Sequence, residues 1–191
     1  ALSGALYEKT QDSNEGYVYE DFTSSGVGIY TASMFFKYNN NQFIHFLLWD
    51  GSGSGVRCYF DIYNGIVGGA TGFGSNFTAS NLAIEDYGDG WYRCSAKFTI
   101  TGSDTTWQFR SSPSSGNGYP NTSIGAKYYF FGAQVEQGSS TTDYIRTGST
   151  SVTVYNDETP DVFIPFISCD SHYFFDSADQ PEVKDRVDSR N

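Results

Sequence analysis

Aromatic and polar residues alternate along several short stretches of this 191-residue chain, and the combination suits the binding of carbohydrate. Sugar rings stack their apolar faces on aromatic side chains, while amide, carboxylate and guanidinium groups hydrogen-bond the hydroxyls. A sheet face that mixes the two predicts glycan binding; the simpler interpretation is ordinary sheet decoration, or burial of Trp91 at the edge of the fold. The residues with this chemistry on expected outward faces are Tyr59, Asp61, Trp91, Arg93, Tyr128, Gln134 and Glu136. Tyr119, in a loop before Pro120, is a separate candidate.

Catalytic residues do not form a recognisable arrangement. The chain has only two histidines, His45 and His172, and a nucleophile activated by histidine would have to use one of them. His45 lies inside an apolar run, which is more typical of a buried, hydrogen-bonded histidine than of a base. Two carboxylates for glycoside hydrolysis can be chosen freely from 22 acidic residues, so that choice carries no information. We therefore expect a protein that is not an enzyme.

Acidic turns offer the only plausible metal ligands, and we predict no cofactor beyond a structural calcium ion as an option. Asp50, Asp86 and Asp89 lie in such turns and could supply oxygen ligands. Calcium takes about six to eight oxygens, usually from closely spaced acidic residues in one loop. The spacing here does not match a calcium-binding loop, so turns that are merely solvated are the simpler interpretation.

The overall charge and the cysteines exclude several classes of protein. A formal charge of −11 repels phosphate backbones, so we expect no nucleic-acid partner. No apolar run approaches the length of a membrane span, and the N-terminus lacks the pattern of a signal peptide, so we expect no membrane insertion. Cys58, Cys94 and Cys169 are irregularly spaced and fit neither a disulfide framework nor a zinc site. Buried free thiols, in a protein assembled in cytoplasm, are the favoured interpretation.

Two stretches show most clearly how side chains would be presented. Residues 90–100 alternate strictly, which predicts a strand with one buried and one solvated face. The expected buried side chains are Tyr92, Cys94, Ala96, Phe98 and Ile100. Residues 128–136 form a second such strand. Its expected apolar side carries Tyr129, Phe131, Ala133 and Val135, and its expected outward side carries Tyr128, Phe130, Gln134 and Glu136.

The rest of the chain also favours β structure, because aromatic residues make up 18% of it and 21 glycines interrupt short apolar runs. Further strands are expected at 1–10, 17–22, 29–37, 42–50, 56–62, 81–87, 105–110 and 151–155, with surface loops at 68–76 and 111–122. The almost continuously apolar run 42–50 suits a central strand that is buried on both faces, or has one face lined for a ligand. We predict an all-β, antiparallel jelly-roll β-sandwich over residues 1–155 and a C-terminal extension over 156–191.

The two clearest strands also carry a resemblance to a known family. The motifs are Gly90-Trp-Tyr-Arg-Cys-Ser95, then Phe131-Gly-Ala-Gln-Val-Glu-Gln-Gly138, then Thr142-Asp-Tyr-Ile145. In this order they resemble the jelly-roll domain, similar to concanavalin A-like folds and to carbohydrate-binding modules, that recurs in tailed-phage virion proteins. The resemblance covers roughly residues 5–154 and implies a jelly-roll fold and a place at the virion surface.

The resulting expectation is a phage structural protein, a fibre or surface-decorating protein, that is assembled in the host cytoplasm and binds host glycan. Two alternatives are a carbohydrate-binding module of a secreted polysaccharide-degrading enzyme and a purely architectural protein that stabilises a capsid or tail. The extension has an apolar segment at 161–167 and an aromatic cluster at 173–175. We expect it to pack on another copy or on a neighbouring virion protein, the alternative being its own sandwich.

Overall fold

A computed structural model describes residues 2, 4–10, 16–23, 26–103, 105–116, 123–146, 152–156 and 159–165. For residue 22 and for the last two ranges the description covers the backbone only. Cys169, His172, Tyr119, the 173–175 cluster and the rest of the extension after residue 165 lie outside the described residues.

Twelve strands and no helix occur in the described part of the chain. Their bounds are β1 Ala5–Glu8, β2 Val18–Thr23, β3 Gly28–Tyr38, β4 Phe43–Trp49, β5 Gly55–Asp61, β6 Ile66–Phe73, β7 Phe77–Asp86, β8 Trp91–Ile100, β9 Thr106–Ser114, β10 Lys127–Gln137, β11 Val152–Asn156 and β12 Thr159–Pro165.

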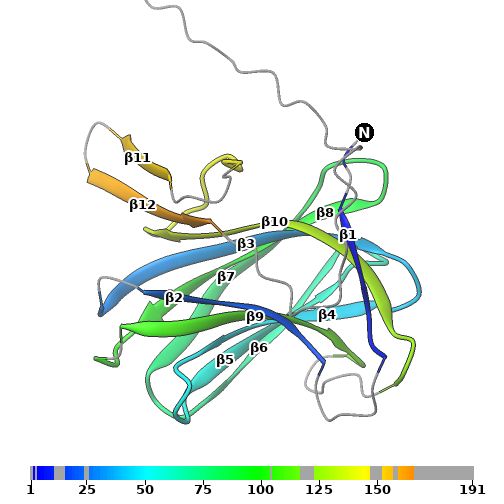
Figure 1. Ribbon diagram of the computed structural model, residues 1–191, viewed down its shortest axis with the longest axis horizontal. Helices are drawn as coiled ribbons and strands as arrows, with labels where there is room; N and C mark the ends of the chain where they lie inside the picture. The colour runs from blue at the N-terminus through cyan, green and yellow to red at the C-terminus, as the bar shows by residue number, and fades with distance from the viewer. Residues whose placement is uncertain are drawn as a thin grey trace, which may run out of the picture.

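The strands form two antiparallel sheets, so the predicted all-β sandwich is confirmed. One sheet has the order β11-β12-β10-β3-β8-β7, with β1 also paired to β10, and the other has the order β2-β9-β4-β5-β6. Figure 1 shows them as two layers, with β10 and β3 in one layer and β9 and β4 in the other. The expected domain boundary after Tyr155 falls inside β11, and β12 joins the body by pairing Gln134 with Pro165 and Val135 with Ile164.

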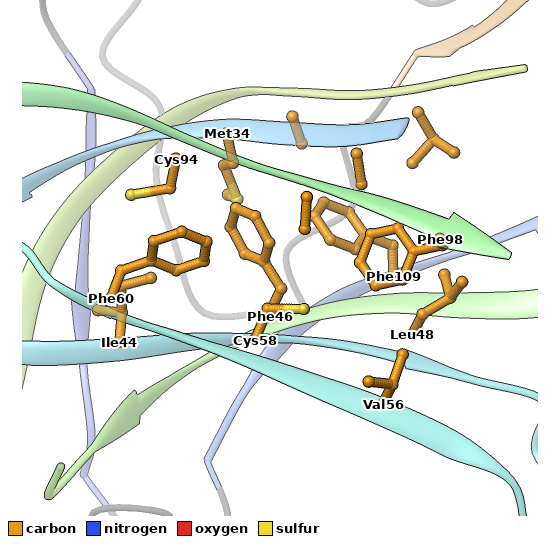
Figure 2. Close-up of a cluster of buried hydrophobic side chains, with 14 of the residues drawn as sticks. Met34, Ile44, Phe46, Leu48, Val56, Cys58, Phe60, Cys94, Phe98 and Phe109 are labelled. Atoms are coloured by element: carbon orange, nitrogen blue, oxygen red, sulfur yellow. The ribbon is translucent and has the colours of Figure 1, made fainter. Parts of the chain in front are cut away.

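An aromatic core fills the space between the layers. The alternation expected for β8 is correct on this side, since Cys94, Ala96, Phe98 and Ile100 are buried in the core. Figure 2 shows side chains of the first sheet, among them Met34 and Phe98, facing Phe46, Phe60 and Phe109 of the second. Burying this much aromatic surface is the main stabilising contribution to a sandwich of this size.

The predicted buried, free state of Cys58 and Cys94 is confirmed. Burial raises the pKa of both thiols, so they stay protonated near neutral pH. Neither thiol has the ionised, accessible character that nucleophilic chemistry requires.

Two expected loops are wrong in part. Residues 66–73 form β6, which pairs with β5, although the stretch is rich in glycine. The hydrogen bonds to β5 are made by the backbone and do not depend on side chains, so the weak strand propensity of glycine does not prevent β6 from forming. Similarly, β9 continues to Ser114, and its serines at 111, 112 and 114 are buried because their hydroxyls find partners, such as Tyr128 Oη for Ser111 Oγ at 3.0 Å.

Candidate functional site

The seven residues expected to bind glycan are all buried, and the structure does not bring them together on one open surface. Their exposed fractions are 0% for Tyr128, 1% for Tyr59, 2% for Glu136, 3% for Trp91, 3% for Gln134, 4% for Arg93 and 8% for Asp61. They occupy three places: the core, the outer face of the β11-β12-β10-β3-β8-β7 sheet, and the outer face of the β2-β9-β4-β5-β6 sheet.

A β-bulge in β10 explains why the outward position expected for Tyr128 is wrong. The pairing of β10 with β3 shifts between Phe131 and Gln134, and Gly132 has a φ of 63° there. An extra residue reverses the side to which every later side chain points. Tyr128 and Phe130 therefore share the core side with Val135, and Tyr128 stacks on Tyr7 with ring centroids 4.8 Å apart.

Gln134 and Glu136 hold a segment of the chain itself. Residues 138–146, here called the strap, lie against the outer side of β10 and β3. Glu136 Oε1 accepts hydrogen bonds from the backbone N–H of Thr142 at 3.2 Å and from its hydroxyl at 2.6 Å. Gln134 Oε1 accepts from the backbone N–H of Ile145 at 2.9 Å, and Gln134 Nε2 donates to Thr142 Oγ1 at 3.2 Å. These two side chains hold the strap against β10 by hydrogen bonds.

The strap covers an aromatic cluster on the outer face of β3, β8 and β10. The Tyr144 ring meets the edges or faces of Phe35 and Phe131, with centroids 5.7 and 6.1 Å away, and burial raises the pKa of Tyr144. Trp91 packs edge-on against Phe131 with centroids 4.9 Å apart. Arg93 Nη2 donates to Ser33 Oγ at 3.0 Å, and its guanidinium lies over the Phe35 ring. The solvated face expected for β8 is therefore wrong at Trp91 and Arg93, which are buried.

The carboxylate of Asp61 does not point freely to solvent; it is hydrogen-bonded within the turn that follows β5. Its oxygens accept hydrogen bonds from Gln42 Nε2, from the backbone N–H groups of Tyr63 and Asn64, and from Asn64 Nδ2. Partial burial alone would raise the pKa of Asp61, but these hydrogen bonds together lower it. Tyr59, two residues earlier, is buried beside His45, with ring centroids 5.6 Å apart.

His45 is buried, as expected, but the expectation that it is fully hydrogen-bonded is wrong. Its Nδ1 has no hydrogen-bond partner among the residues that the structure describes. Burial and the positive charge of Arg57 lower the pKa of His45 to about 3. The imidazole is therefore neutral at ordinary pH.

The outer face of the β2-β9-β4-β5-β6 sheet carries a set of aromatic and polar residues that sequence reasoning missed. We call it the Trp49 surface, and it consists of Tyr17, Tyr19, Trp49, Gln108 and Arg110. Pairing places Tyr19 across from Arg110 and Trp49 across from Gln108, so their side chains share one face. The rings of Tyr17, Tyr19 and Trp49 are partly exposed. The signal was present in the run 42–50, where the outward residues alternate with the core residues but are mostly apolar as well.

Arg110 is fixed between two of these rings. Its guanidinium carbon lies 4.2 Å from the centroid of the Tyr17 ring and 4.1 Å from that of the Trp49 ring. Its Nε and Nη2 donate to Oε1 of Gln108. Stacking a guanidinium on aromatic faces is favourable and fixes the orientation of all three planes. The side chains of this surface are thus fixed by their contacts with one another.

The turn after β4 holds Trp49 in place through Asp50. Asp50 Oδ1 accepts hydrogen bonds from the backbone N–H groups of Ser52, Gly53 and Ser54, at 2.8, 2.9 and 3.0 Å. Asp50 Oδ2 accepts from Asn76 Nδ2 at 3.0 Å, which ties this turn to the turn between β6 and β7. Partial burial would raise the pKa of Asp50, but these hydrogen bonds lower it to about 2.

We expect Asp50→Asn to lower stability by about 1 kcal/mol at pH 7, because four donors lose a charged acceptor. A carboxyl whose pKa is lowered by folding stabilises the protein above its unfolded pKa of about 3.9, and this contribution disappears as the pH falls towards about 2. The difference in free energy of unfolding between the wild type and Asp50→Asn should therefore shrink between pH 5 and pH 2.5, as followed by urea unfolding. A difference that stays constant over this range would contradict the role of the charge.

The acidic turns considered for calcium are occupied by hydrogen bonds within the chain. Besides the contacts of Asp50, Asp86 Oδ1 accepts from the backbone N–H of Gly88 at 2.7 Å. Across the described ranges, no group of three or more His, Cys, Asp or Glu side chains is placed to hold a metal ion. Nor does that part of the chain contain a helix long and apolar enough to cross a membrane.

Comparisons with protein families and with curated proteins found no match to this chain. No protein-family model matches the chain, and no curated protein matches it significantly.

Proposed function

We propose that this chain is a structural protein of a tailed-phage virion, a fibre or surface-decorating protein of jelly-roll topology, that binds host-surface glycan through the Trp49 surface. The observation that carries the proposal is the stack in which Arg110 lies between Tyr17 and Trp49 on an outer sheet face. The virion setting rests on the resemblance of the motifs at 90–95, 131–138 and 142–145, and copies of itself or other virion proteins are its partners there.

The chemistry of the Trp49 surface suits a sugar. Partly exposed rings of Tyr17, Tyr19 and Trp49 offer apolar faces for the C–H side of a pyranose ring. Gln108, partly exposed beside them in β9, adds an amide that is suited to hydrogen-bond a hydroxyl group. Arg110, which is only 9% exposed, orients this amide and the rings of Tyr17 and Trp49.

Rigidity adds to the case for this surface. The aromatic rings and Arg110 hold one another in place, and β9 and β4 are internal strands of their sheet. A ligand therefore orders few side chains when it binds, which reduces the entropic cost of association. By contrast, Gln134 and Glu136 hydrogen-bond the strap, and Trp91 and Arg93 are buried against Phe131 and Phe35.

Screening the intact protein against an array of immobilised glycans tests the proposal, with Trp49→Ala as the diagnostic variant. We expect wild-type protein to bind at least one glycan, and Trp49→Ala to weaken that binding by roughly tenfold or more, because about 1.5–3 kcal/mol accompanies burial of a large side chain. Tyr63→Ala is the matched control, since Tyr63 is 59% exposed but belongs to the turn after β5. It should bind like the wild type.

Two outcomes would overturn the proposal: no binding to any glycan by the wild type, or equal binding by the wild type and Trp49→Ala. Melting temperatures of all three proteins show whether a loss of binding reflects loss of fold. The architectural alternative predicts the first of these outcomes, with the Trp49 surface covered by a neighbouring protein in the particle.

A further inference from the structure

One side of the sandwich ends in two strands that each have an unpaired edge. β6 is the last strand of one sheet and β7 is the last strand of the other, and the turn at residues 74–76 joins them directly. In the described part of the chain, β6 pairs only with β5, and β7 pairs only with β8. Each strand therefore presents a row of backbone N–H and C=O groups that have no partner strand.

This side of the sandwich also lacks charged residues. All 22 acidic and 11 basic residues of the chain lie outside residues 64–84, a stretch that covers β6, the turn and most of β7. Natural edge strands usually carry lysine, other charged side chains or proline, which prevent pairing with another chain. Neither charge nor proline occurs in this stretch, and Ile66 at the start of β6 is 56% exposed. The usual chemical protection of an edge is therefore missing.

Bulges protect only a part of these two edges. The register of β6 against β5 shifts at residues 68–69, and that of β7 against β8 shifts at residues 81–82. A bulge twists an edge strand and interrupts its regular row of backbone groups. The parts next to the turn, residues 70–73 of β6 and 77–80 of β7, pair regularly with their inner neighbours. These two segments are therefore suited to accept a further strand.

The charge of the chain favours a second copy as the partner. With a formal charge of −11, two copies repel each other where their charged surfaces meet, and the repulsion is smallest where both present residues 64–84. A partner of opposite charge gains nothing at an uncharged side. Moreover, the same strand of two copies pairs antiparallel about a twofold axis, and such an arrangement closes at a dimer.

We propose that residues 70–73 of β6 and 77–80 of β7 form the interface of a homodimer, in which each strand pairs antiparallel with its counterpart in the second copy. Both pairings share one twofold axis, because β6 and β7 end their sheets at the same side of the sandwich. Each sheet then continues from one copy into the other, and the backbone groups of these edges gain partners. The inference identifies a surface for self-association and does not depend on glycan binding by the Trp49 surface.

Sedimentation equilibrium of the intact chain tests the proposal. Interfaces of small area are usually weak, so we expect the wild-type mass to rise from one chain to two between about 1 and about 500 µM. The diagnostic variant is Thr71→Glu/Thr78→Glu, because like charges that face each other across the twofold axis should weaken the dimer by about tenfold or more. Both threonines are exposed, and Thr71 pairs with Arg57 of β5, so the single copy should tolerate the change.

Thr105→Glu/Thr106→Glu is the control for net charge. These two exposed threonines lie just before and at the start of β9, and β4 and β5 separate β9 from β6. This variant should therefore have the wild-type mass at every concentration. Melting temperatures of the three proteins show whether both variants remain folded.

Hydrogen exchange of the wild type gives a second test that needs no variant. Amides within residues 70–73 and 77–80 should exchange more slowly at high than at low protein concentration, because hydrogen bonds between copies protect them. Amides of β9, an internal strand, should exchange at a rate that does not depend on concentration.

Three results would overturn the proposal. The first is a wild-type chain that stays a monomer up to about 500 µM, well above the micromolar range in which weak dimers form. The second is an assembly whose mass is the same in Thr71→Glu/Thr78→Glu, which would place the contact between copies elsewhere on the chain. The third is exchange at residues 70–73 and 77–80 that does not change with concentration.

Discussion

Replacing Glu136 with alanine is expected to lower the free energy of unfolding by about 2–3 kcal/mol, because two part-buried donors of Thr142 lose a charged acceptor. Glu136 is 2% exposed, and its carboxylate accepts both the backbone N–H and the hydroxyl of Thr142. Without Glu136, the strap loses one of the two side chains of β10 that hydrogen-bond it, and Tyr144 is held less firmly over Phe35 and Phe131.

The matched control is Glu85→Ala. Glu85 is an exposed carboxylate near the end of β7 in the same sheet, and removing it should change stability by no more than about 0.5 kcal/mol. Urea unfolding followed by tryptophan fluorescence measures both variants. If Glu136→Ala were as stable as Glu85→Ala, Glu136 would not hold the strap, and this account of its role would be contradicted.

Replacing Gly132 with valine is expected to cost about 2–5 kcal/mol. The φ of 63° at Gly132 is a conformation that β-branched residues rarely adopt, at a cost of about 1–2 kcal/mol. In addition, a Cβ at this position would lie 3.0 Å from Phe35 Cδ2 and 3.1 Å from Tyr144 Cε2. Crowding of a packed site adds about 1–3 kcal/mol. Glycine is therefore required where the bulge meets the strap.

Gly69→Val provides the comparison in another strand. Gly69 also lies at an irregularity, where the pairing of β6 with β5 shifts, but it is not among the glycines with positive φ, and a Cβ built there meets no heavy atom within 4 Å. Valine is favoured in strands, so this variant should stay within about 0.5 kcal/mol of the wild type in urea unfolding. A similar loss of stability in both valine variants would indicate a general cost of valine at these positions, and a loss of less than about 1 kcal/mol in Gly132→Val would contradict the account of the bulge.

Side-chain alternation predicted the sandwich well wherever a strand runs without interruption. In β8 the residues that point to the core, such as Cys94 and Phe98, were correctly identified because no bulge disturbs the pairing with β3. In β10 the same reasoning failed at Tyr128, because one extra residue at Gly132 exchanges the two sides of the strand. A bulge glycine and a strand-breaking glycine look alike in a single sequence.

The candidate site was harder to predict than the fold, for two physical reasons. Alternation shows which side chains leave the core, but it does not show that the strap returns over Phe35 and Phe131, or that Trp91 and Arg93 are buried against these two rings. Conversely, Trp49 could not be recognised as a surface residue from the run 42–50, because both faces of β4 carry apolar residues. Only the pairing of β4 with β9, which brings Arg110 and Gln108 beside it, reveals a mixed surface.

The resemblance to phage virion proteins acquires a physical interpretation in this structure. Its motifs lie in β8, in β10 and in the strap, and Gln134 and Glu136 of β10 both hydrogen-bond Thr142 of the strap. They therefore support the architecture of one sheet, and the proposed binding surface lies on the other. The jelly-roll topology and the virion setting remain predictions of that resemblance.

The most direct test of the central claim, that glycan binds on the Trp49 surface, is an NMR titration of the tryptophan indole N–H resonances. The chain has three tryptophans in three different places: Trp49 is partly exposed on this surface, Trp91 is 3% exposed and packs against Phe131, and Trp107 is 1% exposed in the core. Adding a glycan identified on the array should shift the resonance of Trp49, assigned with Trp49→Phe, and leave the other two in place. A shift confined to Trp91 would contradict the account and return the site to the outer face of β8.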